Sequence, residues 1–424
     1  ARRRVPRVCL EGRRGRPLAG TVRVSGAKNS ALKLMAAALL APGVSVIHNV
    51  PDISDVALMA EVLERLGARV TREGHTLSVD AGKITSLEAP YDLVAQMRAS
   101  IVVLGPLVAR FGQARVALPG GCNIGSRKID MHVRGLECLG VEVNLEHGFI
   151  EAIAPAGLSG ADVILDFPSV GATENLVMAA VLAEGTTTIE NAAREPEIGD
   201  LIDMLVAMGA SIAGRGSSTL EITGVPELSP AEHTTVGDRI EAGTFLVAGA
   251  ITGGEITVTG FAPAHLEMVL TKMSLAGCEF DLADDSATVR RTGPVRPVDV
   301  ATLPFPGFPT DMQAQFMALM SIAEGGCLIT ENVFENRFMF ADELKRMGAD
   351  IDIEGHRAFV RGVPRLEGAP VRSPDLRGGA ALVLAGLAAE GETLVTEVHH
   401  IMRGYEDFAG RLGTLGADVR VIDG

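Results

Sequence analysis

The sequence predicts an α/β protein of two domains, assembled from six repeated βαβαβ-type units. Three observations support this fold class. A phrase made of a helix end, an apolar residue, Gly and a small residue recurs about every 70 residues, the length of one such unit. A second phrase, a helix end, Gly and an alternating stretch, recurs at the same interval but out of step. The length of 424 residues also exceeds what one ordinary core uses.

The first phrase marks helices that face outward. Its six copies are VLERLGARV, GLECLGVEV, MLVAMGASI, KMSLAGCEF, ELKRMGADI and RLGTLGADV, with glycines at positions 67, 140, 209, 277, 348 and 416. In the first copy, Ser54 is a candidate N-cap. The apolar residues Leu58, Val62, Leu63 and Leu66 form one stripe on this helix, so one face is expected to be buried.

The second phrase marks the end of an inner helix and the start of a strand. Its copies are LLAPGVSVIHNV, VARFGQARVAL, LAEGTTTIENA, ITGGEITVTGF, AEGGCLITENV and AAEGETLVTEV. The glycine ends the helix because it adopts the left-handed conformation without a Cβ penalty. The alternation predicts a strand with one buried face. Residues Ala31–Ala41 and Leu176–Ala183 are apolar nearly all round, which predicts helices buried inside a domain.

The six units divide near Val236. We expect a first domain over residues 27–235 and a second over residues 1–26 plus 236–424, because the strand around Thr21–Val24 is needed to complete the second half. The chain then crosses between the domains twice, near Gly26 and near Val236. Two crossings predict a double-stranded hinge, and a cleft between hinged domains is a common ligand site.

Composition narrows the class of partner. The formal charge of −15 disfavours nucleic acid and anionic membranes, and the absence of Trp disfavours base stacking. Five widely spaced cysteines without a CxxC pair indicate neither a disulfide framework nor a zinc site. The basic start lacks the apolar region of a signal peptide, and no apolar stretch is long enough to span a bilayer. We therefore expect a soluble cytoplasmic protein.

The loop LPGGCNIGSRKID, Leu118 to Asp130, is the most informative segment. It places Cys122 beside Arg127 and Lys128, and nearby cations lower the pKa of a thiol and make it reactive. The glycines nearly imitate a phosphate-binding P-loop, but Ser126-Arg127 replaces its Lys-Ser/Thr, which disfavours a nucleotide triphosphatase. The alternative is a buried structural thiol. The other four cysteines lie in apolar or repeat contexts, where we expect them to be inert.

Two more segments combine a helix start with a charged residue. In SGAKNS, Lys28 and Asn29 either bind an anion at a helix amino end, or Lys28 is solvated and Asn29 or a serine caps the helix. In FPTDMQAQF, Asp311 is a candidate general base for a substrate hydroxyl, and N-capping by Thr310 or Asp311 is the competing interpretation.

Arg98, Arg377 and Arg403 lie in or beside apolar helical runs, where a guanidinium needs a partner. Phosphate or carboxylate ligands suit the planar fork of Arg, whereas ion pairs with Asp92, Asp375 or Glu406 are the structural alternative. The adjacent His399 and His400 and the Asp130-x-His132 spacing do not match known metal motifs. We interpret these histidines as core or surface residues and expect no metal.

The ordered motifs SGAKN, MRASI, LPGGC-x-IG-x-R, SVGAT, NAAREPEI, DRIE-x-GTF, FPTDMQAQF, VFENRF and HI-x-RGYE resemble those of the UDP-N-acetylglucosamine enolpyruvyl transferases, from about Val8 to the C-terminus. The resemblance implies a two-domain inside-out α/β barrel, with sheets outside and helices within. It implies transfer of the enolpyruvyl group of phosphoenolpyruvate to the 3-hydroxyl of UDP-N-acetylglucosamine with release of phosphate. This is the first committed step of peptidoglycan synthesis and the target of fosfomycin. The resemblance implies no metal, organic cofactor or obligate protein partner.

The resemblance also assigns roles to individual residues. Cys122 matches the general acid toward the methylene carbon, which can form an adduct with phosphoenolpyruvate and is alkylated by fosfomycin, and Asp311 matches the base for the sugar hydroxyl. The matched catalytic set is Cys122, Asp311, Lys28 and Arg403. Positions matched around phosphoenolpyruvate are Lys28, Asn29, Arg127, Arg377 and Arg403. Positions matched near the nucleotide sugar are Arg98, Arg127, Lys128, Ile129, Asp130, Met131, Phe167, Pro168, Ser169, Val170 and Val333.

Two positions depart from the family pattern. Lys128 stands where the family usually has Pro, and Asn123 stands where a smaller residue is frequent. A different acceptor, such as uridine monophosphate or shikimate phosphate, therefore stays an alternative. A paralogue that binds the sugar nucleotide as a silent regulator is a second alternative, disfavoured by the retained Cys122, Lys28 and Asp311.

Overall fold

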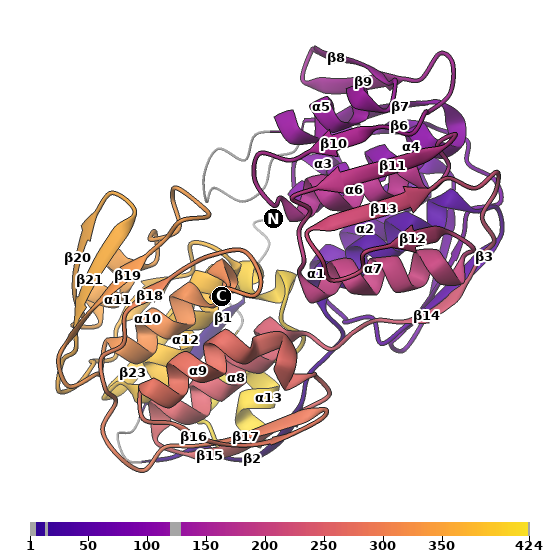
Figure 1. The fold of residues 1–424 in the computed structure, drawn as a ribbon. Helices are drawn as coiled ribbons and strands as arrows, with labels where there is room; N and C mark the ends of the chain where they lie inside the picture. Colours follow the sequence, from indigo (N-terminus) through magenta and orange to yellow (C-terminus); the bar gives the residue numbers. More distant parts are fainter. Residues whose placement is uncertain (1–5, 13–15, 119–128, 423–424) are drawn as a thin grey trace. The chain divides into compact units, whose positions relative to one another are not determined.

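The computed structural model describes residues 6–12, 16–118 and 129–422. It divides the chain into two compact units (Figure 1). We call residues 26–236 the middle unit, and the segment up to Ser25 together with the segment from Gly237 the terminal unit. The chain passes between the units after Ser25 and after Val236, whereas the sequence-based boundaries lie after residues 26 and 235.

Each unit contains three four-stranded sheets among its described residues, and every sheet has one parallel pair followed by two antiparallel pairs. In the middle unit, the strand orders are β14-β3-β5-β4, β6-β7-β9-β8 and β10-β11-β13-β12. The strands are β3 (Val44–His48), β4 (Arg69–Glu73), β5 (Thr76–Asp80), β6 (Glu88–Ala89), β7 (Gln113–Ala117), β8 (Glu142–Glu146), β9 (Phe149–Ile153), β10 (Asp162–Ile164), β11 (Thr186–Glu190), β12 (Ser211–Ala213), β13 (Thr219–Thr223) and β14 (Glu232–Thr234).

The terminal unit repeats this arrangement with the orders β16-β17-β15-β2, β18-β19-β21-β20 and β22-β23-β1-β24. Its strands are β1 (Arg7–Gly12), β2 (Ala19–Arg23), β15 (Glu255–Thr259), β16 (Glu279–Ala283), β17 (Ser286–Arg290), β18 (Val300–Ala301), β19 (Gly326–Thr330), β20 (Asp350–Glu354), β21 (Arg357–Arg361), β22 (Pro370–Arg372), β23 (Gly391–Thr396) and β24 (Val419–Ile422). The six-unit repeat predicted from the sequence is therefore confirmed.

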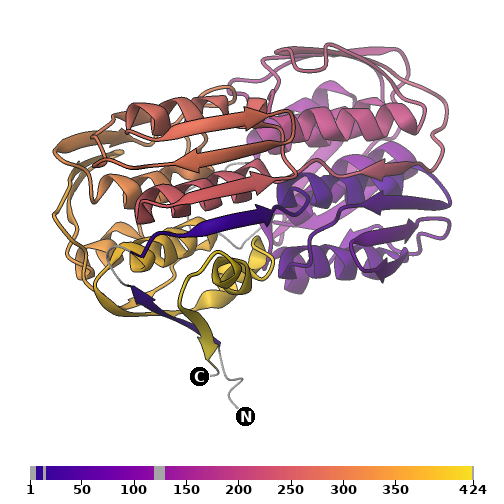
Figure 2. The same cartoon turned by 90° about the horizontal axis from the view of Figure 1, so that it is seen from below.

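The N-terminal segment completes two sheets of the terminal unit. Strand β2 pairs in parallel with β15, so the predicted transfer of an N-terminal strand to the second half is confirmed. Strand β1 lies between β23 and β24 and pairs antiparallel with both, a second insertion that the sequence did not reveal (Figure 2). In the middle unit, β14 closes the first sheet by pairing in parallel with β3. Each unit is thus closed by a strand distant in sequence.

The inner helices fill each unit and are buried on nearly all sides. They are α1 (Lys28–Ala37), α4 (Leu104–Phe111) and α6 (Val170–Ala180) in the middle unit, and α8 (Arg239–Thr252), α10 (Gln313–Met320) and α12 (Leu376–Ala388) in the terminal unit. Short 3₁₀ segments adjoin them: η1 (Ala38–Leu40), η2 (Arg98–Val103), η3 (Pro263–Leu266), η4 (Thr310–Met312) and η5 (Val398–Arg403). The predicted inner helices exist, but α1 and α6 begin earlier than predicted.

A second set of helices has one exposed face: α2 (Ser54–Leu66), α3 (Tyr91–Val94), α5 (Asp130–Cys138), α7 (Pro196–Ala207), α9 (Glu267–Leu275), α11 (Ala341–Arg346) and α13 (Phe408–Thr414). The expected N-cap of α2 is wrong, because Ser54 is already the first helical residue and Ile53 occupies the cap position. The six glycines of the first phrase all have φ between 86° and 107°, as the left-handed helix end requires. Helices inside and sheets outside define an inside-out α/β barrel.

Gly224, directly after β13, packs closely against the backbone of Ala183, which follows α6. The Gly224 amide donates to the Gly185 carbonyl at 2.9 Å, and a Cβ added at Gly224 would collide with the Ala183 carbonyl oxygen. We expect Gly224→Ala to lower the free energy of unfolding by about 2–3 kcal/mol, because backbone rather than a flexible side chain must move. Gly293→Ala, at an open position, is the matched control. Urea unfolding that shows equal stability for both variants would contradict this packing.

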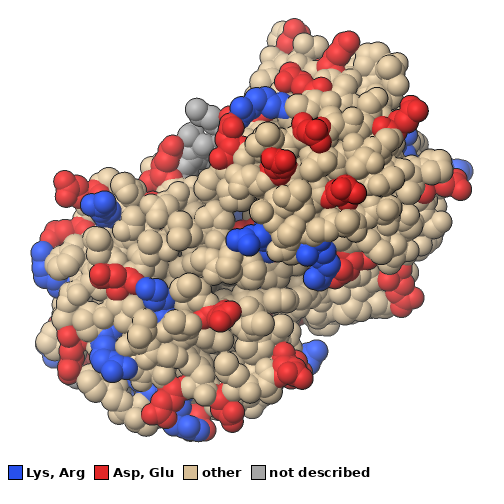
Figure 3. Space-filling model, viewed as in Figure 1, with Lys and Arg blue, Asp and Glu red and all other residues tan. Residues whose placement is uncertain are grey.

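Charged side chains of both signs are interspersed on the face shown in Figure 3. No helix among the described residues is long and apolar enough to cross a membrane.

Candidate active site

Four of the predicted site residues lie at or near the amino ends of inner helices. In the terminal unit, Asp311 lies in η4, which leads into α10, and Arg377 lies in the first turn of α12. In the middle unit, Lys28 is the first residue of α1 and Arg98 is the first residue of η2. Helix amino ends carry N–H groups without intrahelical partners and a partial positive charge, so each unit presents an electropositive end to an anion.

Asp311 forms ion pairs with two arginines. Its Oδ1 lies 2.9 Å from Arg337 Nη2, and its Oδ2 lies 3.2 Å from Arg377 Nη2. The Asp311 side chain is 25% exposed, whereas those of Arg337 and Arg377 are 4% and 2% exposed. Two guanidinium groups favour the ionised carboxylate, the form that accepts a proton from a hydroxyl.

The capping interpretation of this segment is wrong. Pro309 occupies the N-cap position of η4 without a side-chain bond, and the Thr310 hydroxyl donates to Glu331 rather than to the helix. The Asp311 carboxylate pairs with Arg337 and Arg377.

Arg377 does not use Asp375 as its ion-pair partner. Asp375 caps α12 by accepting the backbone N–H groups of Arg377 and Gly378 at 2.9 and 3.0 Å. The guanidinium of Arg377 instead binds Asp311 through Nε and Nη2, and its buried Nη1 has no hydrogen-bond partner among the described residues. A buried, unpaired N–H that belongs to a charged group suits an anionic ligand.

The ring of Tyr405 packs against the guanidinium of Arg377. The guanidinium carbon of Arg377 lies 5.1 Å from the centre of the Tyr405 ring. The Tyr405 hydroxyl lies 2.9 Å from Thr244 Oγ1, and Gln315 Nε2 donates to the Asp311 carbonyl at 2.9 Å. Burial raises the pKa of Tyr405, so the phenol stays neutral.

Arg403, two residues before Tyr405, is half-buried at the end of η5. Val333 is half-buried in the turn after β19.

Lys28 is buried in the middle unit, so its interpretation as a solvated lysine is wrong. Its Nζ lies 2.8 Å from Asp55 Oδ2, and Lys28 is 9% exposed. Asn29 is half-buried and does not cap α1, because Ala27 holds the cap position without a side-chain bond. The Asn29 carbonyl accepts a bond of 2.8 Å from Lys33 Nζ. A lysine held at a helix amino end is a preformed anion contact.

Two segments matched to nucleotide contacts are joined by an arginine. Arg134 lies 3.4 Å from Asp130 and 2.5 Å from Asp166, so it links the start of α5 to the residues before α6. The first segment is Ile129, Asp130 and Met131, and the second is Phe167, Pro168, Ser169 and Val170. Ser169 caps α6 by accepting the Ala172 N–H at 3.3 Å. The exposed Phe167 side chain is available to a ligand.

His132 is a buried neutral histidine, which agrees with its interpretation as a core residue. Asn175 Nδ2 lies 2.9 Å from its Nδ1. Burial, and next the charge of Arg98, lower the pKa of His132 to about 4, against an opposing effect of Asp130. No group of His, Cys, Asp and Glu suited to a metal ion occurs among the described residues.

The lowered pKa of His132 makes stability depend on pH. The unfolded chain binds a proton at His132 near pH 6.5 and the folded chain only near pH 4, so the free energy of unfolding falls as the pH falls through this window. We expect a loss on the order of 3 kcal/mol, with no contribution from this group above the window. Urea unfolding across this pH range should show a shallower loss for His132→Gln, whereas the exposed His356→Gln should follow the wild type.

Three predicted residues, Cys122, Arg127 and Lys128, lie outside the described residues. Among the other cysteines, Cys278 and Cys327 are buried, and burial raises the pKa values of their thiols to about 11 and about 12. These two thiols are protonated at neutral pH and inaccessible. Cys138 is exposed, so its expected inertness does not follow from burial.

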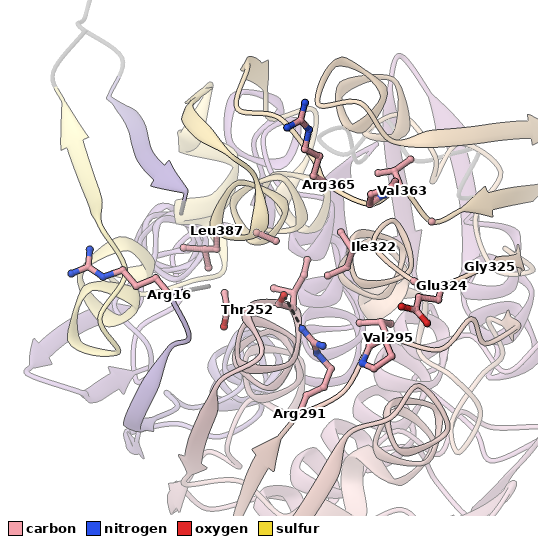
Figure 4. A pocket seen from close by; sticks show the side chains of 16 residues that line it. Arg16, Thr252, Arg291, Val295, Ile322, Glu324, Gly325, Val363, Arg365 and Leu387 are labelled. Carbon is pink, nitrogen blue, oxygen red and sulfur yellow. Dashed lines mark hydrogen bonds between the residues drawn. The ribbon is translucent and has the colours of Figure 1, made fainter. Parts of the chain in front are cut away.

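The terminal unit contains a cavity of about 570 Å³ (Figure 4). Its lining includes Thr252, Ala323 and Ala388, which mark the carboxyl ends of α8, α10 and α12. Asp311 and Arg377 lie at the opposite, amino ends of the same helices. None of the predicted site residues lines this cavity.

Sequence reasoning missed Arg337 as a site residue. It belongs to the VFENRF motif, but nothing in its local sequence shows that its guanidinium reaches Asp311, 26 residues away in the chain. An arginine that is only 4% exposed is the structural signal.

Comparisons with known proteins agree with the fold. The family described as EPSP synthase (3-phosphoshikimate 1-carboxyvinyltransferase) matches residues 13–412. UDP-N-acetylglucosamine 1-carboxyvinyltransferase of Mycolicibacterium paratuberculosis is 55% identical over 409 residues, which cover 96% of this chain and 98% of the relative. The enzyme of the same name from Trichlorobacter lovleyi is 54% identical over 410 residues, covering 96% and 97%.

Solved structures share the architecture. The enolpyruvyl transferase NikO from Streptomyces tendae has a TM-score of 0.88 at 29% identity and covers 99% of this chain and all of its own. EPSP synthase from Acinetobacter baumannii has a TM-score of 0.75 at 16% identity over 99% of this chain and 100% of its own, and shows the fold alone.

The family match and the inside-out barrels define a carboxyvinyltransferase, and the chain belongs to the EPSP synthase (3-phosphoshikimate 1-carboxyvinyltransferase) family. The two relatives described above, with 54% and 55% identity over the aligned residues, are named UDP-N-acetylglucosamine 1-carboxyvinyltransferases.

Proposed function

We propose that this protein transfers the enolpyruvyl group of phosphoenolpyruvate to the 3-hydroxyl of UDP-N-acetylglucosamine and releases phosphate. The observation that carries the proposal is the identity of 54–55% over 96% of the chain with enzymes of that name. We place the reaction in the cytoplasm, as the first committed step of peptidoglycan synthesis.

The chemistry requires an acid, a base and a phosphate clamp. The sugar hydroxyl oxygen bonds to C2 of phosphoenolpyruvate while Asp311 takes its proton, and Cys122 donates a proton to the methylene carbon. Loss of a methyl proton and of phosphate then restores the double bond. Lys28, Arg127, Arg377 and Arg403, with Asn29, are the proposed contacts to the phosphate and carboxylate of phosphoenolpyruvate.

The structure supports the role of Asp311 most directly. Its carboxylate pairs with two arginines and retains 25% exposure, so a hydroxyl can approach it. The buried Nη1 of Arg377 has no hydrogen-bond partner among the described residues and can donate to an anion. We add Arg337 to the site as the residue that orients the base. The proposed reaction uses no metal ion and no organic cofactor.

The sugar-nucleotide contacts are proposed from the two segments that Arg134 links. Ile129 directly precedes α5, and Asp130 and Met131 begin it. Residues 167–169 precede α6, which begins at Val170. Arg98, Arg127, Lys128 and Val333 complete the proposed set. Lys128 and Asn123 favour one alternative, an enolpyruvyl transferase with another acceptor such as uridine monophosphate.

An acceptor panel tests the proposal. Phosphate release is measured with phosphoenolpyruvate and, in parallel, UDP-N-acetylglucosamine, uridine monophosphate or shikimate 3-phosphate. We expect release only with the amino-sugar nucleotide. Release with another acceptor alone would assign a different substrate, and binding of the nucleotide sugar without release would favour a silent regulator.

A further inference from the structure

We propose that Glu331 is a positioning residue for this reaction: its buried carboxylate ties the segment that bears Asp311 to the turn that bears Val333 and leads to Arg337. The inference rests on the proposed function, because it concerns the geometry of the proposed base. Glu331 is not one of the residues assigned to the acid, the base or the phosphate clamp, and it contacts the proposed sugar contact Val333 only through the backbone N–H of that residue.

Glu331 lies directly after β19, and its carboxylate accepts four hydrogen bonds. Oε1 accepts from Thr302 Oγ1 at 2.9 Å and from the backbone N–H groups of Val333 and Phe334 at 2.9 and 3.0 Å. Oε2 accepts from Thr310 Oγ1 at 2.9 Å. The residue is 2% exposed. An ionised carboxylate has about four acceptor positions, so this group is fully satisfied where it lies.

These bonds join two segments that also meet at the proposed base. Thr310 precedes Asp311 in η4, so the bond to Oε2 fixes the start of the segment that carries the base. On the other side, the Arg337 guanidinium carbon lies 5.6 Å from the Phe334 ring and its Nη2 lies 2.9 Å from Asp311. The two segments are therefore linked twice, once through Glu331 and once through the ion pair.

The turn after β19 departs from the repeat. In four of the six repeats, the residue after the equivalent strand has a left-handed backbone: Asn49, Asn191, Gly260 and Glu397, with φ of 56°, 57°, 85° and 56°. Glu331 is not among the left-handed residues of the described chain. Its side chain instead binds the turn, and the Asn332 amide donates to Thr302 Oγ1 at 2.9 Å. The repeat therefore does not explain why a carboxylate stands at this position. A role in holding the segment of the neighbouring base, Asp311, does explain it.

The bonding pattern predicts graded effects of substitution. In Glu331→Gln, the amide oxygen can keep the three donors at Oε1, but the amide nitrogen faces Thr310, whose hydroxyl must then accept instead of donate. In Glu331→Ala, all four donors lose their acceptor, and both segments are free to shift. A displacement of about 1 Å at a reacting group can lower a rate by about 100-fold.

The test is steady-state kinetics with phosphoenolpyruvate and UDP-N-acetylglucosamine, combined with calorimetric binding of the nucleotide and thermal unfolding. We expect kcat to fall by about 10-fold in Glu331→Gln and about 100-fold in Glu331→Ala. The KM for UDP-N-acetylglucosamine should rise several-fold because Val333 moves, whereas the KM for phosphoenolpyruvate should change little. Glu354→Gln, the same change at an exposed glutamate of the same unit, is the control and should match the wild type.

Thr310→Val removes one of the four bonds and should lower kcat only slightly. Combined with Glu331→Gln, its effect should be less than additive, because both changes disturb one contact. If Glu331→Ala does not fold, Thr310→Val and Glu331→Gln still test the inference.

Unchanged kcat and KM in folded Glu331 variants, or a fall in kcat that only follows the folded fraction with both KM values unchanged, would overturn the inference while the wild type still transfers the enolpyruvyl group. A wild type without any transfer activity would overturn the proposed function and this inference with it.

Discussion

Asp311→Asn is expected to lower kcat by about three orders of magnitude while the protein stays folded. A general base contributes about 10²–10⁴-fold to such a step, and an amide cannot take the proton of the sugar hydroxyl. The Asn side chain keeps an oxygen for Arg337, at the position where Oδ1 now lies 2.9 Å from Nη2. The KM values should change less than kcat, since the lost interaction is needed mainly in the transition state.

The control for this prediction is Asp284→Asn, which makes the same change at an exposed aspartate of the terminal unit. Circular dichroism and thermal unfolding separate loss of the base from loss of structure, because Asp311→Asn leaves two buried arginines with less compensating charge. A folded Asp311→Asn variant that keeps a tenth or more of the wild-type kcat would rule out Asp311 as the base.

Fosfomycin is expected to inactivate the wild type irreversibly and to spare Cys122→Asp. The thiolate of Cys122 is the proposed nucleophile, and neighbouring Arg127 and Lys128 favour it. A carboxyl group can still donate a proton to the methylene carbon, so Cys122→Asp should retain turnover, whereas Cys122→Ser should lose about 100-fold or more in kcat.

Mass spectrometry locates the modified residue. Cys278 and Cys327 are buried with raised pKa values, and burial also raises the pKa of the half-buried Cys9, so Cys138 is the most exposed competing thiol among the described cysteines. Cys138→Ser is therefore the matched control and should be inactivated like the wild type. Modification at a residue other than Cys122, or inactivation of Cys122→Asp, would contradict the assignment.

Much of the fold was predictable because the sequence repeats it. Each glycine of the first phrase ends a helix in the left-handed conformation, and the alternating stretches become the central strands of the sheets. These signals are local: a glycine at a helix end and a period of two depend on a few neighbouring residues. Strand β1 was not predictable in this way, because its partners β23 and β24 come from the other end of the chain.

The sequence by itself determined the six-unit α/β architecture, the family and the residue types available for the chemistry. Only the tertiary structure decided what those residues do. In the folded protein, Asp311 pairs with Arg337 and Arg377. Lys28 is buried in an ion pair with Asp55, and the Glu331 carboxylate accepts four hydrogen bonds. The reason is physical: capping is a contact within one turn, whereas these pairs join segments as far as 66 residues apart, and burial excludes the water that would otherwise replace them.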